Sequence, residues 1–332
     1  IGERCVSVQT RDAAQVPFCA LLELSRADEL PKKDILVVAP LSGHFPILLR
    51  DLVIGLVPHF RVYVTDWINA RYVPLENGAF GLENNIGCVL ELTRLLRPRP
   101  AILAVCQGGI PALAATALLG AEDSPSAPSS VVLIAAPIDP SASPSRVSRL
   151  LRSRPLTWMQ DNLIVPVPAP FPGRGRPCYP AQFQLAALLS YLTKQLGQGS
   201  PEMWAKILAD DGVDPIRYPF LELYSSIMDL DAACFLESIR FAYHEGSFAR
   251  AKLRYRDAPV DLGAIDRSAL LTIEGEWDDV AAPGQTSAAH DLCRSIPATA
   301  RGRIVVPRSG HFSLFHGAIW RKVVLPELLK FC

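Results

Sequence analysis

The sequence lacks any long apolar run, since none of its segments approaches the roughly 20 apolar residues that a membrane-spanning helix needs. It also lacks net charge, because 33 Lys and Arg residues balance 33 Asp and Glu residues. No basic face is therefore indicated, and we expect no nucleic-acid partner. Internal repeats and low-complexity tracts are missing too. With 332 residues, 49% of them hydrophobic, the chain can bury a sizeable core.

The eight cysteines lack the close C-x-x-C spacing of zinc sites, so the sequence indicates no metal site. A chain of this length does not need disulfides, and we expect reduced cysteines in a cytoplasmic protein. The opening residues, "IGERCVSVQTRD", contain neither an initiator Met nor a signal-peptide pattern. We therefore expect that the sequence begins after a trimmed start.

Short apolar strands alternate with helical segments at both ends of the chain. The segments that predict buried strands are 34–40, 61–67, 101–106, 130–137, 269–278 and 302–307. Strands that are apolar throughout indicate a mostly parallel sheet flanked by helices on both faces. This pattern predicts an α/β core made of residues 1–139 and 266–332.

Residues 140–265 interrupt the alternation with a segment rich in proline and aromatic residues, followed by helical patterns. The interruption lies between two predicted strands of the sheet. Open α/β sheets carry their sites at the carboxyl ends of the strands. We therefore expect residues 140–265 to form a largely helical cap, or lid, over those ends.

The stretch "AILAVCQGGIPALAATALLG" (101–120) reads as a strand, a tight turn and a helix, with Cys106 at the turn. This is the form of a nucleophile elbow, in which small residues flank the nucleophile because the turn is strained and passes close to a neighbouring strand. Ala104 and Gly108 are the small residues here. The helix N-terminus favours a thiolate and faces developing negative charge.

A thiol nucleophile needs a base and a group that orients the base. His311 lies after the last predicted strand, and Asp278 closes the preceding one. The order nucleophile, acid, base is that of the α/β-hydrolase fold, which is the fold we expect. For the oxyanion hole we expect the backbone N–H of Gln107 and that of Leu41 or Ser42.

Each of these candidates has a structural alternative. Taken alone, Cys106 would be an ordinary buried cysteine, and it is the elbow, with His311 and Asp278 in the right order, that favours catalysis. His311 taken alone would be a loop histidine. Asp279 stays open as the acid in place of Asp278.

The remaining candidates concern substrate contact. His44 follows the predicted oxyanion loop and would line the site or be structural. In the cap, Trp158 and Tyr179 are candidates for substrate contact, and Trp158 with Trp204 could equally form the core of the cap.

Several long motifs resemble the intracellular poly(3-hydroxybutyrate) depolymerase family. They are "VVAPLSGHFPILLRDLV", "VYVTDWINARYVPL", "AVCQ" and "GEWDDVAAPGQTSAAHDLC", and the similarity extends from about residue 15 to the end. Family members carry an additional N-terminal segment, which agrees with a trimmed start. The resemblance implies an α/β-hydrolase with a Cys-His-Asp triad at Cys106, His311 and Asp278, and without a metal or organic cofactor.

The activity that this resemblance implies is hydrolysis of polyester chains on storage granules to hydroxybutyrate oligomers and monomer. The partners would be the polymer and the granule surface. Polyhydroxyalkanoate synthases share the cysteine elbow, so an acyltransferase, including a coenzyme A-dependent one, is an alternative. A second alternative is a non-catalytic granule-binding protein, although such a protein would be expected to lack one of the three triad residues.

Overall fold

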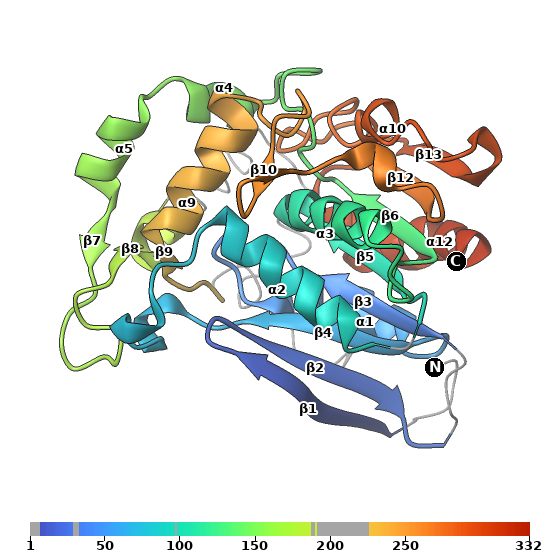
Figure 1. The fold of residues 1–332 in the computed structure, drawn as a ribbon, viewed down its shortest axis with the longest axis horizontal. Helices are drawn as coiled ribbons and strands as arrows, with labels where there is room; N and C mark the ends of the chain where they lie inside the picture. Colours follow the sequence, from blue (N-terminus) through green and yellow to red (C-terminus); the bar gives the residue numbers. More distant parts are fainter. Residues whose placement is uncertain (1–6, 29–32, 97, 187–189, 191–225) are drawn as a thin grey trace.

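A computed structural model describes residues 7–28, 33–96, 98–186, 190 and 226–332. Its largest feature is a sheet of eight strands in the order β1-β2-β4-β3-β5-β6-β12-β13 (Figure 1). The strands are β1 Val8–Val16, β2 Cys19–Arg26, β3 Asp34–Val38, β4 Arg61–Trp67, β5 Ala101–Val105, β6 Ser130–Ile134, β12 Ala269–Gly275 and β13 Arg301–Val306.

The strands from β4 to β13 in this order are parallel to one another. Strands β3, β5 and β6 are buried at every position, as their uninterrupted apolar runs require. All the strands expected from the sequence are present, with bounds that differ by a few residues. The predicted mostly parallel sheet is therefore confirmed.

Two strands precede those that the sequence analysis placed first. β1 and β2 form an antiparallel hairpin, and β2 pairs antiparallel with β4. β1 is exposed along most of its length, so its sequence, "VQTRDAAQV", carries no apolar pattern. Pairing with β2, and not burial, keeps it in the sheet, which explains why periodicity did not reveal it.

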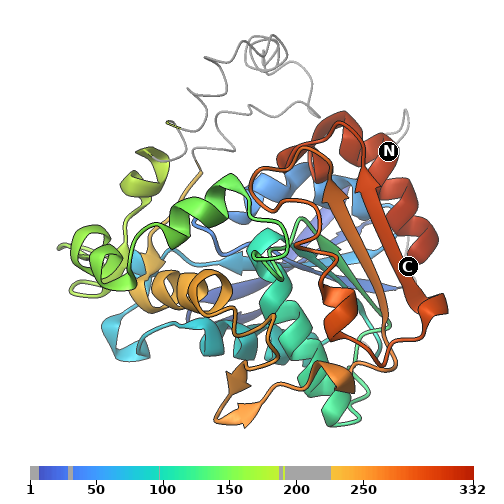
Figure 2. The ribbon, with the colours of Figure 1, turned by 90° about the horizontal axis from the view of Figure 1, so that it is seen from above.

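Helices cover both faces of the sheet. α2 (Leu82–Arg94) and α3 (Gly109–Ala121) lie on one face, while α1 (Arg50–Leu56) and α12 (Leu325–Phe331) lie on the other (Figures 1 and 2). α2 turns its apolar side inward, whereas α3 is buried at nearly all positions. Its many Ala and Gly residues allow α3 to pack closely against the sheet and α2.

Between β6 and β12 the chain leaves the large sheet. The described elements there are α4 Arg146–Arg152, α5 Leu156–Leu163, β7 Val165–Pro166, β8 Pro177–Tyr179, β9 Leu230–Asp231, α9 Ala232–Ile239, a π-helix Arg240–His244, β10 Arg254–Tyr255 and β11 Ala258–Pro259. Strands β7, β8 and β9 form a small antiparallel sheet. The described part of this segment thus holds more helix than strand.

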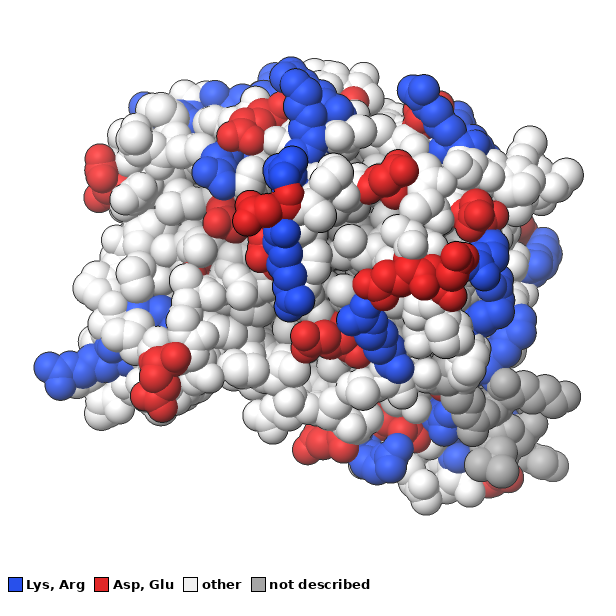
Figure 3. Space-filling model, viewed as in Figure 1, with Lys and Arg blue, Asp and Glu red and all other residues white. Residues whose placement is uncertain are grey.

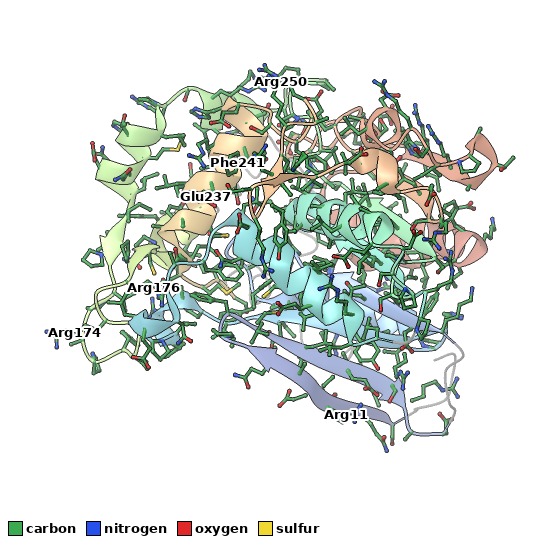
Figure 4. All side chains as sticks on the ribbon, viewed as in Figure 1. Arg11, Arg174, Arg176, Glu237, Phe241 and Arg250 are labelled. Carbon is green, nitrogen blue, oxygen red and sulfur yellow. The ribbon has the colours of Figure 1, made fainter. Side chains whose placement is uncertain are left out.

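Two arginine–aspartate pairs tie this small sheet to the loop after β4. Arg71 binds both carboxylate oxygens of Asp229 at 2.9 Å. Arg176, only 1% exposed and labelled in Figure 4, pairs with Asp231 at 2.8 Å and donates to backbone carbonyls of the 73–78 loop. A guanidinium group that makes two or more hydrogen bonds fixes the orientation of the groups that it joins. This part of the insertion, the segment of residues 140–265, is therefore anchored to the core.

The surface mixes charges of both signs. Figure 3 shows Lys and Arg side chains interspersed with Asp and Glu side chains on the face seen in Figure 1. The described face therefore agrees with the zero formal charge.

None of the described helices is both long and apolar enough to cross a bilayer.

The chain returns to the core through a close contact with α3. A Cβ added to Gly120 would lie 2.3 Å from the backbone carbonyl oxygen of Ala264. A Cβ added to Gly87, in α2, would meet only the hydroxyl end of the Tyr255 side chain, at 3.1 Å. A side chain at Gly120 would therefore clash with backbone atoms, whereas one at Gly87 would meet only the end of a side chain that can move.

We predict that Gly120→Ala destabilises the protein by about 1–3 kcal/mol, because a backbone carbonyl cannot move aside cheaply. Gly87→Ala is the matched control and should be neutral or stabilising by up to about 1 kcal/mol, the helix-propensity difference. Urea unfolding of both variants measures this. Equal effects would show that the return contact does not constrain α3.

Candidate active site

Cys106 lies directly after β5, at the first residue of a 3-10 turn, Cys106–Gly108, that leads into α3. Its φ of 51° is in the left-handed region, where a residue other than Gly costs about 1–3 kcal/mol and persists only if its surroundings enforce it. The side chain is buried, with Cys106 9% exposed. The backbone therefore has the strained turn that an elbow requires.

Close packing around the turn explains the glycines that follow. A Cβ on Gly108 would lie 2.6 Å from the Val38 carbonyl oxygen, and one on Gly109 would lie 2.6 Å from the Ala136 Cβ. Residues at the ends of β3 and β6 thus pack closely against the start of α3. This is the close approach that the small residues in the sequence predicted.

Asp278 and His311 are joined in the buried loops after β12 and β13. His311 Nδ1 lies 2.8 Å from Asp278 Oδ2, and both side chains are almost completely buried. The other oxygen of Asp278 accepts the backbone N–H groups of Val280 and Ala281, each at 2.8 Å. The sequence left Asp279 open as the acid, and in the structure it is Asp278 that contacts His311.

The His311 ring is electrostatically coupled to its neighbours. Burial alone would lower the pKa of His311, but the charges of Asp278 and Cys106, and hydrogen bonds to both, raise this pKa well above its usual value. Because Nδ1 faces Asp278, Nε2 is the nitrogen left for the Cys106 sulfur. The three side chains are therefore brought together, and a positively charged ring beside the sulfur is favoured.

A second buried carboxylate, Glu274, shapes the loop that carries Asp278. Its Oε1 accepts the backbone N–H groups of Gly284, Thr286 and Ser287 at 2.8–3.0 Å. The start of the insertion contacts the same loop, since the Ser145 hydroxyl donates a hydrogen bond to the Val280 carbonyl at 2.7 Å. The acid is thus held by contacts from both the core and the insertion.

A pocket opens beside the elbow, between the core and the second half of the insertion. Its lining residues are Leu41, Leu82, Asn85, Gln107, Ile110, Pro137, Ser238, Phe241, Ala242 and Tyr243. Two predicted oxyanion residues, Gln107 and Leu41, are among them. Ser42 is not, and its carbonyl accepts a hydrogen bond from the Gln184 amide.

The structure does not bring the predicted substrate-lining residues to this pocket. His44 is 9% exposed, and its loop forms a bridge with Ile227. Trp158 is 38% exposed with the Arg154 guanidinium 5.0 Å from its ring centroid. Tyr179 stacks on Phe235 with ring centroids 4.0 Å apart, and Trp204 lies outside the described residues.

Sequence reasoning missed Asn85, Phe241 and Tyr243, which do line the pocket. Asn85 is a polar residue on the buried side of α2, a signal that the helical pattern contains. Tyr243 belongs to the π-helix, whose extra residue per turn re-aims side chains in a way that apolar periodicity does not reveal. π-Helical turns occur often at functional sites.

The other cysteines differ from Cys106 in their surroundings. In the described part of the chain all seven cysteines are free. Burial raises the pKa of the thiols of Cys88, Cys178, Cys234 and Cys293 to about 12.

Among the described residues, no group of three or more His, Cys, Asp and Glu side chains could hold a metal ion.

The sequence matches the model of a known protein family. A family model described as PHB de-polymerase C-terminus matches residues 135–332, which is more than half of the chain. A search of curated proteins gave no match.

Solved structures resemble the whole chain. A hydrolase from Pseudomonas aeruginosa is 16% identical with a TM-score of 0.54, and 97% of each chain is covered. The 2-hydroxy-6-oxo-6-phenylhexa-2,4-dienoate hydrolase from Rhodococcus sp. strain RHA1 is 14% identical with a TM-score of 0.54, covering 98% of this chain and 99% of that one. The α/β-hydrolase fold expected from the sequence is confirmed.

We predict that Asp278→Asn lowers the pKa of His311, because it removes the carboxylate charge that raises this pKa. The ring should then lose its proton at a lower pH than in the wild type. NMR titration of the His311 ring measures the change. The matched control is Asp279→Asn, which removes the adjacent charge and should leave the His311 titration near that of the wild type. Equal shifts in both variants would contradict a specific Asp278–His311 pair.

Proposed function

Because this chain belongs to the PHB depolymerase family, we propose that it hydrolyses poly(3-hydroxybutyrate) through Cys106, His311 and Asp278. Family membership and the α/β-hydrolase fold support a hydrolase. The observation that carries the proposal is the buried His311–Asp278 contact of 2.8 Å beside a cysteine at a strained strand–helix turn. A nucleophile, a base and a group that orients the base are the parts that acyl transfer requires.

In the first half-reaction, His311 takes the Cys106 proton, or the pair already rests as thiolate and imidazolium. The sulfur attacks the ester carbonyl carbon, forming a C–S bond and an oxyanion. Collapse of this intermediate breaks the ester C–O bond, and His311 protonates the departing alkoxide oxygen, which leaves as a hydroxyl group. Asp278 accepts a hydrogen bond from the Nδ1–H of His311, which fixes the ring and stabilises its positive charge.

The oxyanion would be held by the backbone N–H groups of Gln107 and Leu41, supported by their shared position at the pocket. In the second half-reaction, His311 takes a proton from water, which attacks the thioester carbonyl. The C–S bond then breaks, the carboxylic acid leaves, and the proton on His311 returns to the sulfur or stays on the ring beside the thiolate, which restores the starting pair. No metal or organic cofactor takes part in these steps.

We place this reaction at polyester granules in the cytoplasm, with residues 140–265 acting as the cap over the site. The lining of the pocket supports the cap assignment, since it combines Phe241 and Tyr243 from the insertion with Leu41 and Gln107 from the core. The low exposure of Cys106, 9%, is consistent with this cover.

Replacing Cys106 with Ala should reduce hydrolysis of amorphous poly(3-hydroxybutyrate) granules by roughly 10⁶-fold, the loss seen when a triad nucleophile is removed. Released hydroxybutyrate is measured over time, with thermal melting as the check of folding. Cys332→Ala is the control and should retain activity. Assays with and without coenzyme A test the acceptor, because hydroxybutyryl-coenzyme A as the main product would indicate an acyltransferase. Activity of Cys106→Ala at the wild-type level would refute the covalent mechanism.

Iodoacetamide should inactivate the enzyme by labelling Cys106 first. Burial raises the thiol pKa at most of the other described cysteines, which keeps them as unreactive thiols. The experiment uses a Cys5→Ala background, because Cys5 lies outside the described residues. Peptide mass spectrometry at partial inactivation identifies the site. Preferential labelling of any cysteine other than Cys106 would count against an activated thiol.

A further inference from the structure

The chain that follows His311 turns back against the imidazole ring. Phe312–Leu314 form a 3-10 turn, and Phe315, 1% exposed, comes directly after it. The rings of Phe312 and Phe315 lie nearly perpendicular to the His311 ring, with centroids 5.1 Å and 5.7 Å from its centroid. Aromatic rings prefer this edge-to-face arrangement. The direction of the imidazole ring therefore depends on where this turn is held.

The far end of the turn is held by one buried carboxylate, that of Asp51 in α1. Asp51 is 3% exposed. Its Oδ2 accepts the backbone N–H of Gly317 at 2.8 Å and the Arg321 guanidinium at 3.1 Å, and the Nδ1 of His316 lies 3.5 Å from the same oxygen. The backbone carbonyl of Asp51 accepts the indole N–H of Trp320 at 3.0 Å. Residues 316–321 are thus gathered on a single residue from another part of the core.

Apolar packing would hold these two segments together without the carboxylate. Gly317 begins the C-terminal helical segment that continues into α12. This segment lies so close to α1 that a Cβ on Gly55 would be 2.9 Å from the indole nitrogen of Trp320. Replacing a buried ion pair with apolar side chains often leaves stability unchanged. What Asp51 adds is therefore direction, because its hydrogen bonds fix the position of Gly317.

We infer that Asp51 is a positioning residue for the proposed base, which it directs toward Cys106 by holding the turn against which the His311 ring lies. The inference rests on the proposed function. Asp278 binds Nδ1 and so fixes one side of the ring. The turn fixes the ring through its two phenylalanines, which keeps Nε2 toward the sulfur. Loss of this hold should impair the proton transfers and leave substrate binding unchanged, since Asp51 is not among the residues that line the pocket.

The first measurement is kinetic, with thermal melting as the check of folding. Asp51→Leu should lower kcat for p-nitrophenyl butyrate by about 10- to 100-fold with KM within about twofold, because a displaced base slows the chemical step. Asp51→Asn can still accept the Gly317 N–H but loses the charge that attracts Arg321, so kcat should fall only about 3- to 10-fold. If Asp51→Leu does not fold, Asp51→Asn decides alone. Wild-type kcat in either folded variant would overturn the inference.

Asp34→Leu is the matched control. Asp34 is 4% exposed, and the Arg61 guanidinium donates to both of its carboxylate oxygens at 2.9–3.1 Å. It begins β3, whereas Cys106 follows the carboxyl end of the parallel neighbour β5. This variant therefore also removes a buried carboxylate from an arginine, but at the opposite edge of the sheet, and should keep the wild-type kcat. Equal losses of kcat in Asp34→Leu and Asp51→Leu would show that Asp51 is merely structural.

A second measurement needs no substrate. Alkylation of Cys106 by iodoacetamide, followed across pH by peptide mass spectrometry, reports how far His311 stabilises the thiolate. In Asp51→Leu the midpoint pH of alkylation should rise by about 1 unit, because a displaced imidazolium attracts the thiolate less. In Asp34→Leu it should stay at the wild-type value.

An unchanged midpoint in Asp51→Leu would overturn the positioning role. Granule degradation by the wild type, together with an unchanged midpoint and kcat in the Asp51 variants, would refute that role alone. The expected shift of the midpoint in a protein whose wild type degrades no granules would refute the depolymerase activity alone.

Discussion

The strained turn at Cys106 is the constraint on which the rest of the site depends. A positive φ at a residue with a side chain is sustained only because β5 and α3 are both locked in place around it. The Val38 carbonyl lies so close to Gly108 that no side chain would fit there. The same turn leads directly into α3, which begins at Gly109.

Buried carboxylates organise the other half of the site. Asp278 divides its two oxygens between His311 and the backbone of its own loop, so that one residue both fixes the His311 ring and shapes the turn. Glu274 performs the second of these tasks alone. Because each carboxylate accepts three hydrogen bonds, its burial is compensated.

The insertion contributes in two distinct ways. Arg71 and Arg176 fasten its small sheet to the loop after β4, at a distance from the chemistry. α9 and the π-helix instead line the pocket together with α2, so that Phe241, Tyr243 and Asn85 are all among its lining residues. Anchoring and pocket lining are therefore carried by different segments, and the aromatic residues that look conspicuous in the sequence, such as Trp158 and Tyr179, do not line the pocket.

The sequence alone determined the parallel strands, the elbow with its glycines, and the order of Cys106, Asp278 and His311, because apolar runs and small residues report local backbone requirements. It did not reveal the β1–β2 hairpin, whose exposed first strand depends on pairing and not on burial. Only the tertiary structure shows the contact between Asp278 and His311 and assembles the pocket from α2 and the π-helix. Adjacent acids on one loop differ only in the direction of their side chains, which the sequence does not report. Residues more than 150 positions apart, such as Glu237 and Leu82, meet only when the chain folds back on itself.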